Sequence, residues 1–132
     1  MYEVEQLTDL IGKTLTKVEH VKAGPDKDDE IVFTVDDGSQ YRLYHNQDCC
    51  ESVTVEDIIG NLDDLVGAPI LMAEEVTYDN QNPVDVEVRE RYDDSFTWTF
   101  YKFATVKGYV TIRWYGESNG YYSESVDFAR IS

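Results

Sequence analysis

Long apolar runs are missing from this chain of 132 residues. None approaches the roughly 20 residues that a membrane-spanning helix needs, and residues 1–5 lack the basic and apolar regions of a signal peptide. Cysteine is scarce as well, because the only two, Cys49 and Cys50, are neighbours. Adjacent cysteines form a disulfide only with strain, and that bond would tie no distant segments together. We therefore expect a cytoplasmic protein of a reducing compartment, with no membrane partner.

Basic residues are also few: 11 Lys and Arg stand against 27 Asp and Glu, which gives a net charge of −16 at pH 7. Phosphate backbones repel such a surface, so we expect no direct binding of nucleic acid. The acidic excess is uneven, because residues 48–94 hold fourteen acids against two arginines, whereas residues 95–132 hold three acids and four Lys or Arg. This pattern fits either a solvated surface or an electronegative face for a basic protein or divalent cations.

The remaining sequence is typical of a globular protein, with 42% hydrophobic residues. Apolar and polar residues alternate around Asp37-Gly38, Lys107-Gly108 and Asn119-Gly120, which predicts β-hairpins. Residues 4–11 and 54–66 carry apolar side chains at helical spacing. We expect a single domain, residues 1–132, of the α+β class. About seven or eight strands would form an antiparallel sheet or a partly open barrel, with one or two short helices and the 54–66 helix packed on it.

Ten of the seventeen aromatic residues lie between Phe96 and Tyr122. Alternation assigns one set to the core face: Phe96, Trp98, Phe100, Val110, Ile112 and Trp114. It assigns the other set to the opposite face: Thr97, Thr99, Tyr101, Tyr109, Thr111, Arg113 and Tyr115. Tyrosine and arginine are enriched at interface hot spots, so Tyr101, Arg113 and Tyr115 are candidate partner-binding residues. The alternative is that helices or a second sheet cover this face.

A charged strand is the second candidate interface. Valines at 84, 86 and 88 alternate with charged residues, as in an edge strand with one solvated face. The acidic residues that we expect to bind a partner here are Asp85, Glu87, Glu90, Asp93 and Asp94. The same edge could pair across a dimer, although its charge disfavours that, and the oligomeric state stays open.

The segment His45-Asn46-Gln47-Asp48-Cys49-Cys50-Glu51 holds the densest group of metal-ligating residue types. His45, Cys49 and Cys50 are zinc ligands by type, but adjacent side chains of an extended chain point to opposite faces. The main interpretation is structural, with the cysteines as small buried hydrophobes. A zinc site with His45 and one thiol, or a cysteine nucleophile paired with His45, stays open as an alternative. No phosphate-binding glycine loop or nucleophile elbow occurs, and we expect neither an enzyme nor another cofactor.

Two groups of motifs stand out. The first comprises His45-x-Gln47-Asp48-Cys49-Cys50-Glu51-x-Val53, Asp63-Asp64-Leu65-Val66-Gly67-x-Pro69-Ile70 and Ala73-Glu74-Glu75. The second comprises Thr97-Trp98-Thr99-Phe100-Tyr101 and Trp114-Tyr115-Gly116-x-Ser118-Asn119-Gly120-Tyr121-Tyr122-Ser123-Glu124. Over about residues 10–128 the chain resembles an uncharacterised family of small proteins encoded by phages and prophages of bacteria. The resemblance implies a phage accessory protein in the cytoplasm of the bacterial host cell, and it transfers no activity and no catalytic residue.

Three functions remain as hypotheses. The leading one is a non-enzymatic binding module that occupies the basic surface of a host nucleic-acid-binding or defence protein and imitates DNA with its carboxylates. The second is a small-molecule binder that holds a nucleotide on the Tyr/Arg face, which requires Arg113, Lys102 and Lys107 to converge. The third is a metal-dependent enzyme built on His45 and the two cysteines.

Overall fold

The computed structural model describes residues 3–4, 6–22, 28–48, 50–81 and 95–131. Within these ranges the chain forms nine strands and two short 3-10 helices. In chain order they are β1 (Glu3–Val4), η1 (Leu7–Leu10), β2 (Leu15–Val21), β3 (Glu30–Val35), β4 (Gln40–Tyr44), β5 (Ser52–Ile59), η2 (Leu62–Leu65), β6 (Met72–Asp79), β7 (Ser95–Thr105), β8 (Gly108–Ser118) and β9 (Asp127–Arg130).

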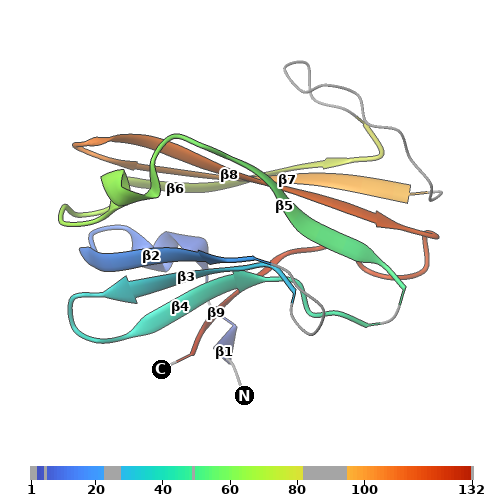
Figure 1. The fold of residues 1–132 in the computed structure, drawn as a ribbon, viewed down its shortest axis with the longest axis horizontal. Coiled ribbons are helices and arrows are strands. Elements are labelled where there is room, and N and C mark those ends of the chain that lie inside the picture. The colour runs from blue at the N-terminus through green and yellow to red at the C-terminus, as the bar shows by residue number, and fades with distance from the viewer. Residues whose placement is uncertain (1–2, 5, 23–27, 49, 82–94, 132) are drawn as a thin grey trace.

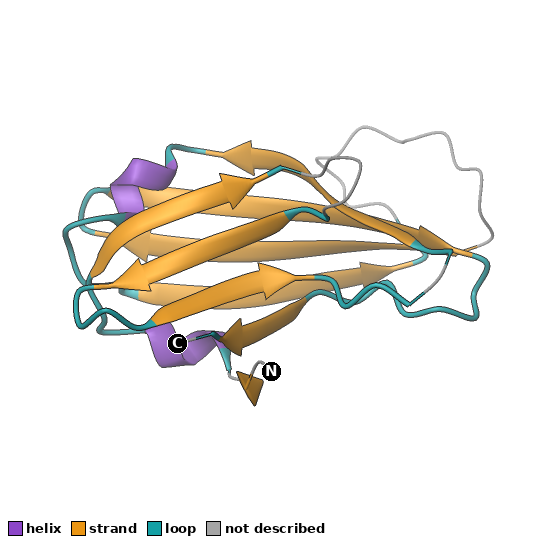
Figure 2. Cartoon of the chain, turned by 60° about the horizontal axis from the view of Figure 1, so that its bottom comes forward, coloured by secondary structure: helices purple, strands orange, loops and turns teal. Residues whose placement is uncertain are grey.

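The strands form two sheets whose named pairings are all antiparallel. One has the order β1-β9-β4-β3-β2 and the other β5-β8-β7-β6. The two sheets lie face to face as layers of a sandwich, and β1 lies beside β9 (Figure 1). Seen from a second direction, the short helices lie toward one end of the layers (Figure 2). None of the helices in the described ranges has the length and apolarity that crossing a bilayer demands.

The predicted antiparallel sheet with short helices is confirmed, but the α+β class is wrong, because the protein is mainly β and its only described helices are two short 3-10 helices. The two sheets do not form a closed barrel. The expected helix over 54–66 is instead strand β5, a turn and η2. Apolar residues in a short segment fit either period, and β-branched Val55, Ile58 and Ile59 favour a strand. Gly60 then breaks the segment at φ 102°, where an added Cβ would lie 2.6 Å from the Tyr109 carbonyl oxygen.

The main core lies between the sheets. Phe33 of β3 and Phe103 of β7 come from different sheets, and their ring centroids lie 5.5 Å apart. Phe128 of β9 adds an edge contact to Phe33. These aromatic contacts bury large apolar surfaces from both layers, which is the dominant favourable term in sandwich folds.

The side chains that β7 and β8 direct into the main core differ in part from the predicted set. Thr105 pairs with Gly108, so odd residues of β7 stand opposite even residues of β8. Val110, Ile112 and Trp114 belong to the main core, as predicted. Phe96, Trp98 and Phe100 were expected beside them, but they share the opposite face with Tyr115 in a second cluster. Consequently Thr97, Thr99 and Tyr101, expected on the solvent side, lie on the inner face.

Candidate functional site

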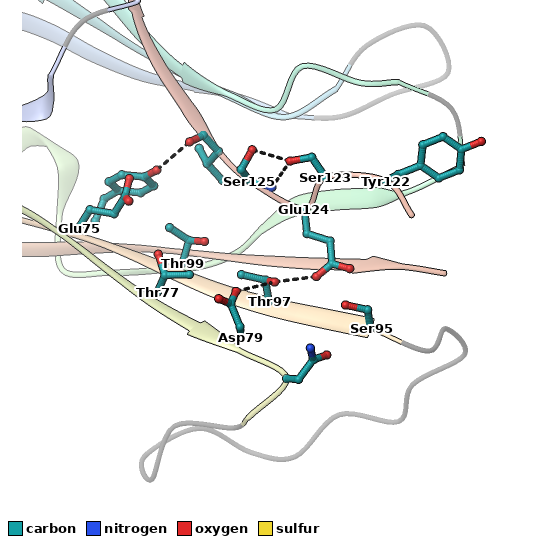
Figure 3. A pocket seen from close by; sticks show the side chains of 13 residues that line it. Glu75, Thr77, Asp79, Ser95, Thr97, Thr99, Tyr122, Ser123, Glu124 and Ser125 are labelled. Carbon is teal, nitrogen blue, oxygen red and sulfur yellow. Dashed lines mark hydrogen bonds between the residues drawn. The ribbon is translucent and has the colours of Figure 1, made fainter. Parts of the chain in front are cut away.

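A cavity of about 440 Å³ lies between the inner face of β6 and β7 and the segment 122–126, which we call the roof (Figure 3). Its floor consists of three cross-strand pairs, in each of which a β6 residue stands opposite a β7 residue. The pairs are Glu75 with Tyr101, Thr77 with Thr99, and Asp79 with Thr97. Alternate residues of a strand face the same side, so the floor is a ladder of hydroxyls with a carboxylate toward each end.

Glu124 of the roof reaches down to this floor. Its side chain is buried, and Oε1 accepts a hydrogen bond of 2.6 Å from the Thr97 hydroxyl while Oε2 accepts one from the fully buried Ser118 hydroxyl. Gly116 of β8 makes the approach possible, because an added Cβ would lie 3.0 Å from the Glu124 Cβ and 3.1 Å from a Val53 methyl. The carboxylate is therefore fixed within the cavity by residues of both β7 and β8.

The Thr97 hydroxyl has two acceptors and one proton. Its Oγ1 lies 2.6 Å from Glu124 Oε1 and 3.2 Å from Asp79 Oδ1. A hydroxyl donates one hydrogen bond, so it cannot serve both carboxylates at full strength. This end of the cavity is short of a donor, which favours a cationic or hydrogen-bond-donating ligand.

Tyr101 closes the other end of the floor. It is 1% exposed, contrary to the prediction of a surface residue, and it donates to the Val126 carbonyl at 3.2 Å. Burial raises the pKa of Tyr101, and the hydrogen bond and charge of Glu75 raise it further. The phenol stays neutral at physiological pH, so the negative charge at this end belongs to Glu75.

A second cavity of about 620 Å³ adjoins the first, with Glu75 and Val126 lining both. We call the two together the acidic groove. Five carboxylates line it: Glu74, Glu75, Asp79, Glu124 and Asp127. Within the described part of the chain, no Lys, Arg or His lines either cavity.

A buried histidine holds the roof in place. His45 Nδ1 lies 2.6 Å from the Ser125 carbonyl oxygen, and Nε2 lies 2.7 Å from Glu51 Oε2. Glu51 Oε2 also accepts the Asp48 N–H at 2.8 Å. Each ring nitrogen therefore lies within hydrogen-bond distance of an oxygen of the chain. The connection from β4 to β5 thereby anchors the segment that covers the groove.

The family model for a domain of unknown function, DUF7448, matches residues 8–128. The chain belongs to this family. Comparison with curated proteins and with solved structures finds no match.

The motifs that carried the resemblance to an uncharacterised family meet at the acidic groove. The first group supplies His45, Glu51 and Glu75, and the second supplies the β7 residues of the floor, Ser118 and residues 122–124 of the roof. In the sequence these groups lie far apart, and the hydrogen bond from His45 to Ser125 joins residues 80 positions apart. Alternation alone does not indicate this meeting, because it depends on the pairing of β7 with β8 and on the packing of the two sheets.

The predicted metal ligands have other partners in this structure. Both nitrogens of His45 are hydrogen-bonded within the chain. We expected a reduced and buried cysteine at position 50. Instead Cys50 is exposed, because it lies in the β4–β5 connection outside the core. It is also disulfide-bonded. Cys49 lies outside the described residues. No group of three or more His, Cys, Asp and Glu in the described ranges is arranged to hold a metal ion.

The predicted partner-binding residues fall into three groups. The acidic residues Asp85, Glu87, Glu90, Asp93 and Asp94 lie outside the described residues. Tyr101 and Tyr115 are buried rather than exposed, Tyr101 in the main core and Tyr115 against Trp98 with ring centroids 4.5 Å apart.

Arg113 is half-buried, and its Nε donates to Glu56 at 2.6 Å. Lys107, expected to converge with it on a nucleotide, instead donates to the Val66 carbonyl at 2.6 Å. The floor residues Thr97 and Thr99, together with Glu124, were missed as site residues.

Proposed function

We propose that the protein is a non-enzymatic binding module, encoded by a phage or prophage, that captures a basic host protein in the bacterial cytoplasm. The observation that carries this proposal is the acidic groove, in which five carboxylates gather without a basic residue among its described lining. The partner would be a nucleic-acid-binding or defence protein, because a surface that binds phosphates also complements a row of carboxylates.

The groove suits binding better than proton transfer. Glu124 has both oxygens hydrogen-bonded to hydroxyls of its own chain, which fixes a negative charge in place. A general acid or base must instead exchange its proton with a substrate in direct reach. A concave surface of one sign also concentrates the field and speeds the approach of an oppositely charged partner.

Affinity capture from host lysate with matched charge variants tests the proposal. The groove variant carries Glu74→Lys and Asp79→Lys, both exposed on β6. The control variant carries Asp36→Lys and Asp63→Lys, which are exposed outside the groove and change the net charge equally. We expect the native protein and the control to retain a common basic partner and the groove variant to lose it.

Competition with duplex DNA provides a second readout. An excess of DNA should release the captured partner, because both ligands occupy the same basic surface. Equal capture by the groove and control variants would contradict a role of the groove. Capture that persists unchanged in excess DNA at low salt would contradict a partner with a nucleic-acid-binding surface.

A further inference from the structure

Thr99 lies in the middle of the floor of the 440 Å³ cavity and is only 4% exposed. Its side chain is directed toward the space beneath the roof (Figure 3). Among the described residues, no hydrogen bond joins the Thr99 hydroxyl to a side chain or to the backbone, and its oxygen is not fully enclosed by the chain but opens into the cavity. A hydroxyl that opens into a cavity from an otherwise buried residue is available to a ligand that completes its hydrogen bonding.

The neighbouring end of the cavity lacks a donor. Asp79 and Glu124 both face the one proton of Thr97, and Thr99 follows two positions along the same face of β7. Acceptors therefore outnumber donors over a short stretch of the floor. A ligand with several donors and a positive charge would satisfy the two carboxylates and the Thr99 hydroxyl together.

We infer that this cavity binds a primary ammonium group, supplied by a lysine side chain of the partner protein. The inference rests on the proposed function and adds to it the residue type that enters the groove. The ammonium donates to the carboxylates of Asp79 and Glu124 and to the hydroxyl of Thr99. The aliphatic part of the lysine lies along the Thr77–Thr99 pair.

The carboxylates favour lysine over arginine. A guanidinium binds best to a carboxylate with both oxygens free, as a planar fork. Here Glu124 Oε2 accepts from Ser118, and Glu124 Oε1 and Asp79 Oδ1 compete for the single Thr97 proton, so neither carboxylate presents two unobstructed oxygens. The three donors of an ammonium can instead reach separate acceptors in different directions. A bare metal ion is a poorer fit, because the described carboxylates are not arranged as a metal-binding group.

Titrations followed by amide NMR shifts test the inference on the full chain. The ligands are the Nα-acetyl methylamides of lysine, arginine and norleucine. We expect the lysine compound to shift the amide signals of Asp79, Thr97, Thr99 and Glu124, the arginine compound to bind more weakly, and the uncharged norleucine compound to leave them unchanged. Equal or tighter binding of the arginine compound would overturn the assignment.

Thr99→Val is the sharpest variant, because valine keeps the shape and removes only the hydroxyl. We expect the lysine compound to bind about tenfold or more weakly, as for a lost hydrogen bond to a charged group. The free energy of unfolding should stay the same or rise, whereas a purely structural role of the hydroxyl predicts a fall. Asp79→Asn should weaken binding as well, with Asp36→Asn as the control of equal charge change.

Two further outcomes are decisive. Tighter binding of the free polyamine spermidine than of the lysine compound would assign the cavity to a small polycation and overturn the lysine assignment. If reversal of the groove charge abolishes partner capture but Thr99→Val changes neither capture nor titration, the proposed function stands and the lysine pocket is wrong. If the lysine compound binds but charge reversal leaves capture unchanged, the proposed function is wrong.

Discussion

His45 and Glu51 form a buried hydrogen-bonded pair that reaches from the β4–β5 connection to the roof of the acidic groove. His45 is 4% exposed and Glu51 is 5% exposed. Polar side chains at such depth are favourable only while their hydrogen bonds are present. The pair therefore links the stability of the protein to the geometry of the groove.

Glu51→Gln tests this link. We expect the free energy of unfolding to fall by about 1–3 kcal/mol, because the variant weakens the buried hydrogen bonds that join Glu51 Oε2 to His45 Nε2 and to the Asp48 N–H. Urea denaturation measures the effect. Glu19→Gln, which breaks the exposed pair with Lys17, is the control and should cost less than about 1 kcal/mol. Equal losses in the two variants would contradict the buried pair.

The residue types in the sequence predicted the chemistry of single side chains better than they predicted which groups those side chains contact. The sequence marked the segment that contains His45 and Glu51 as the densest group of metal-ligating residue types, with His45 as a candidate zinc ligand. The Ser125 carbonyl, which engages His45, comes from a segment 80 residues away. A backbone oxygen leaves no signature in the sequence, so this contact could not be predicted.

Among the elements, the β3–β4 hairpin was predicted correctly from Asp37-Gly38. Asp37 Oδ1 accepts both the Ser39 hydroxyl, at 2.6 Å, and the Ser39 N–H, at 2.8 Å. The side-chain bond and then the backbone bond to Ser39 lower the pKa of Asp37 from its usual 3.8. These bonds fix the turn that sets the register of the two strands.

The lowered pKa predicts an acid-dependent contribution to stability. The folded state holds the Asp37 carboxylate more tightly than the unfolded state does, so the contribution is complete above about pH 3.8 and is lost as the pH falls through the lower folded value. We expect Asp37→Asn to reduce the free energy of unfolding by a constant amount near neutral pH and by less below pH 3.8. Denaturation at a series of pH values measures this difference. A difference that grows toward low pH would contradict the mechanism, and exposed Asp36→Asn is the control.

The segment 54–66 shows why other elements were missed. Its apolar residues recur at helical spacing, yet β5 lies beside β8, where Val55 stands opposite Trp114 and Ile58 opposite Ile112. Pairing with a neighbouring strand outweighed the local pattern. In β7, the alternation of residues correctly separated the side chains into two faces. Which of these faces turns inward depends on the register of the β7–β8 hairpin, and the pattern in β7 alone does not give that register.

The whole molecule carries a net charge of −16. Mutual repulsion of the carboxylates destabilises the compact state at low ionic strength, where the screening length is about 30 Å, more than at physiological salt, where it is about 8 Å. We expect the thermal unfolding midpoint to rise as sodium chloride is added over this range. Partner capture should weaken over the same range. A midpoint that is unchanged or lower in salt would contradict the role of repulsion, and uncharged sucrose controls for general solute effects.

The order of the strands has a consequence for the chain as it is synthesised. The entire four-stranded sheet, β5 to β8, is inserted between β4 and β9, which are neighbours in the other sheet. A ribosome therefore delivers β2, β3 and β4 first and the strand that covers the edge of β4 last. Until Asp127–Arg130 emerges, that edge keeps its backbone groups unpaired, the condition in which nascent strands associate with other chains. Formation of β9 thus decides whether the exposed edge of β4 is protected.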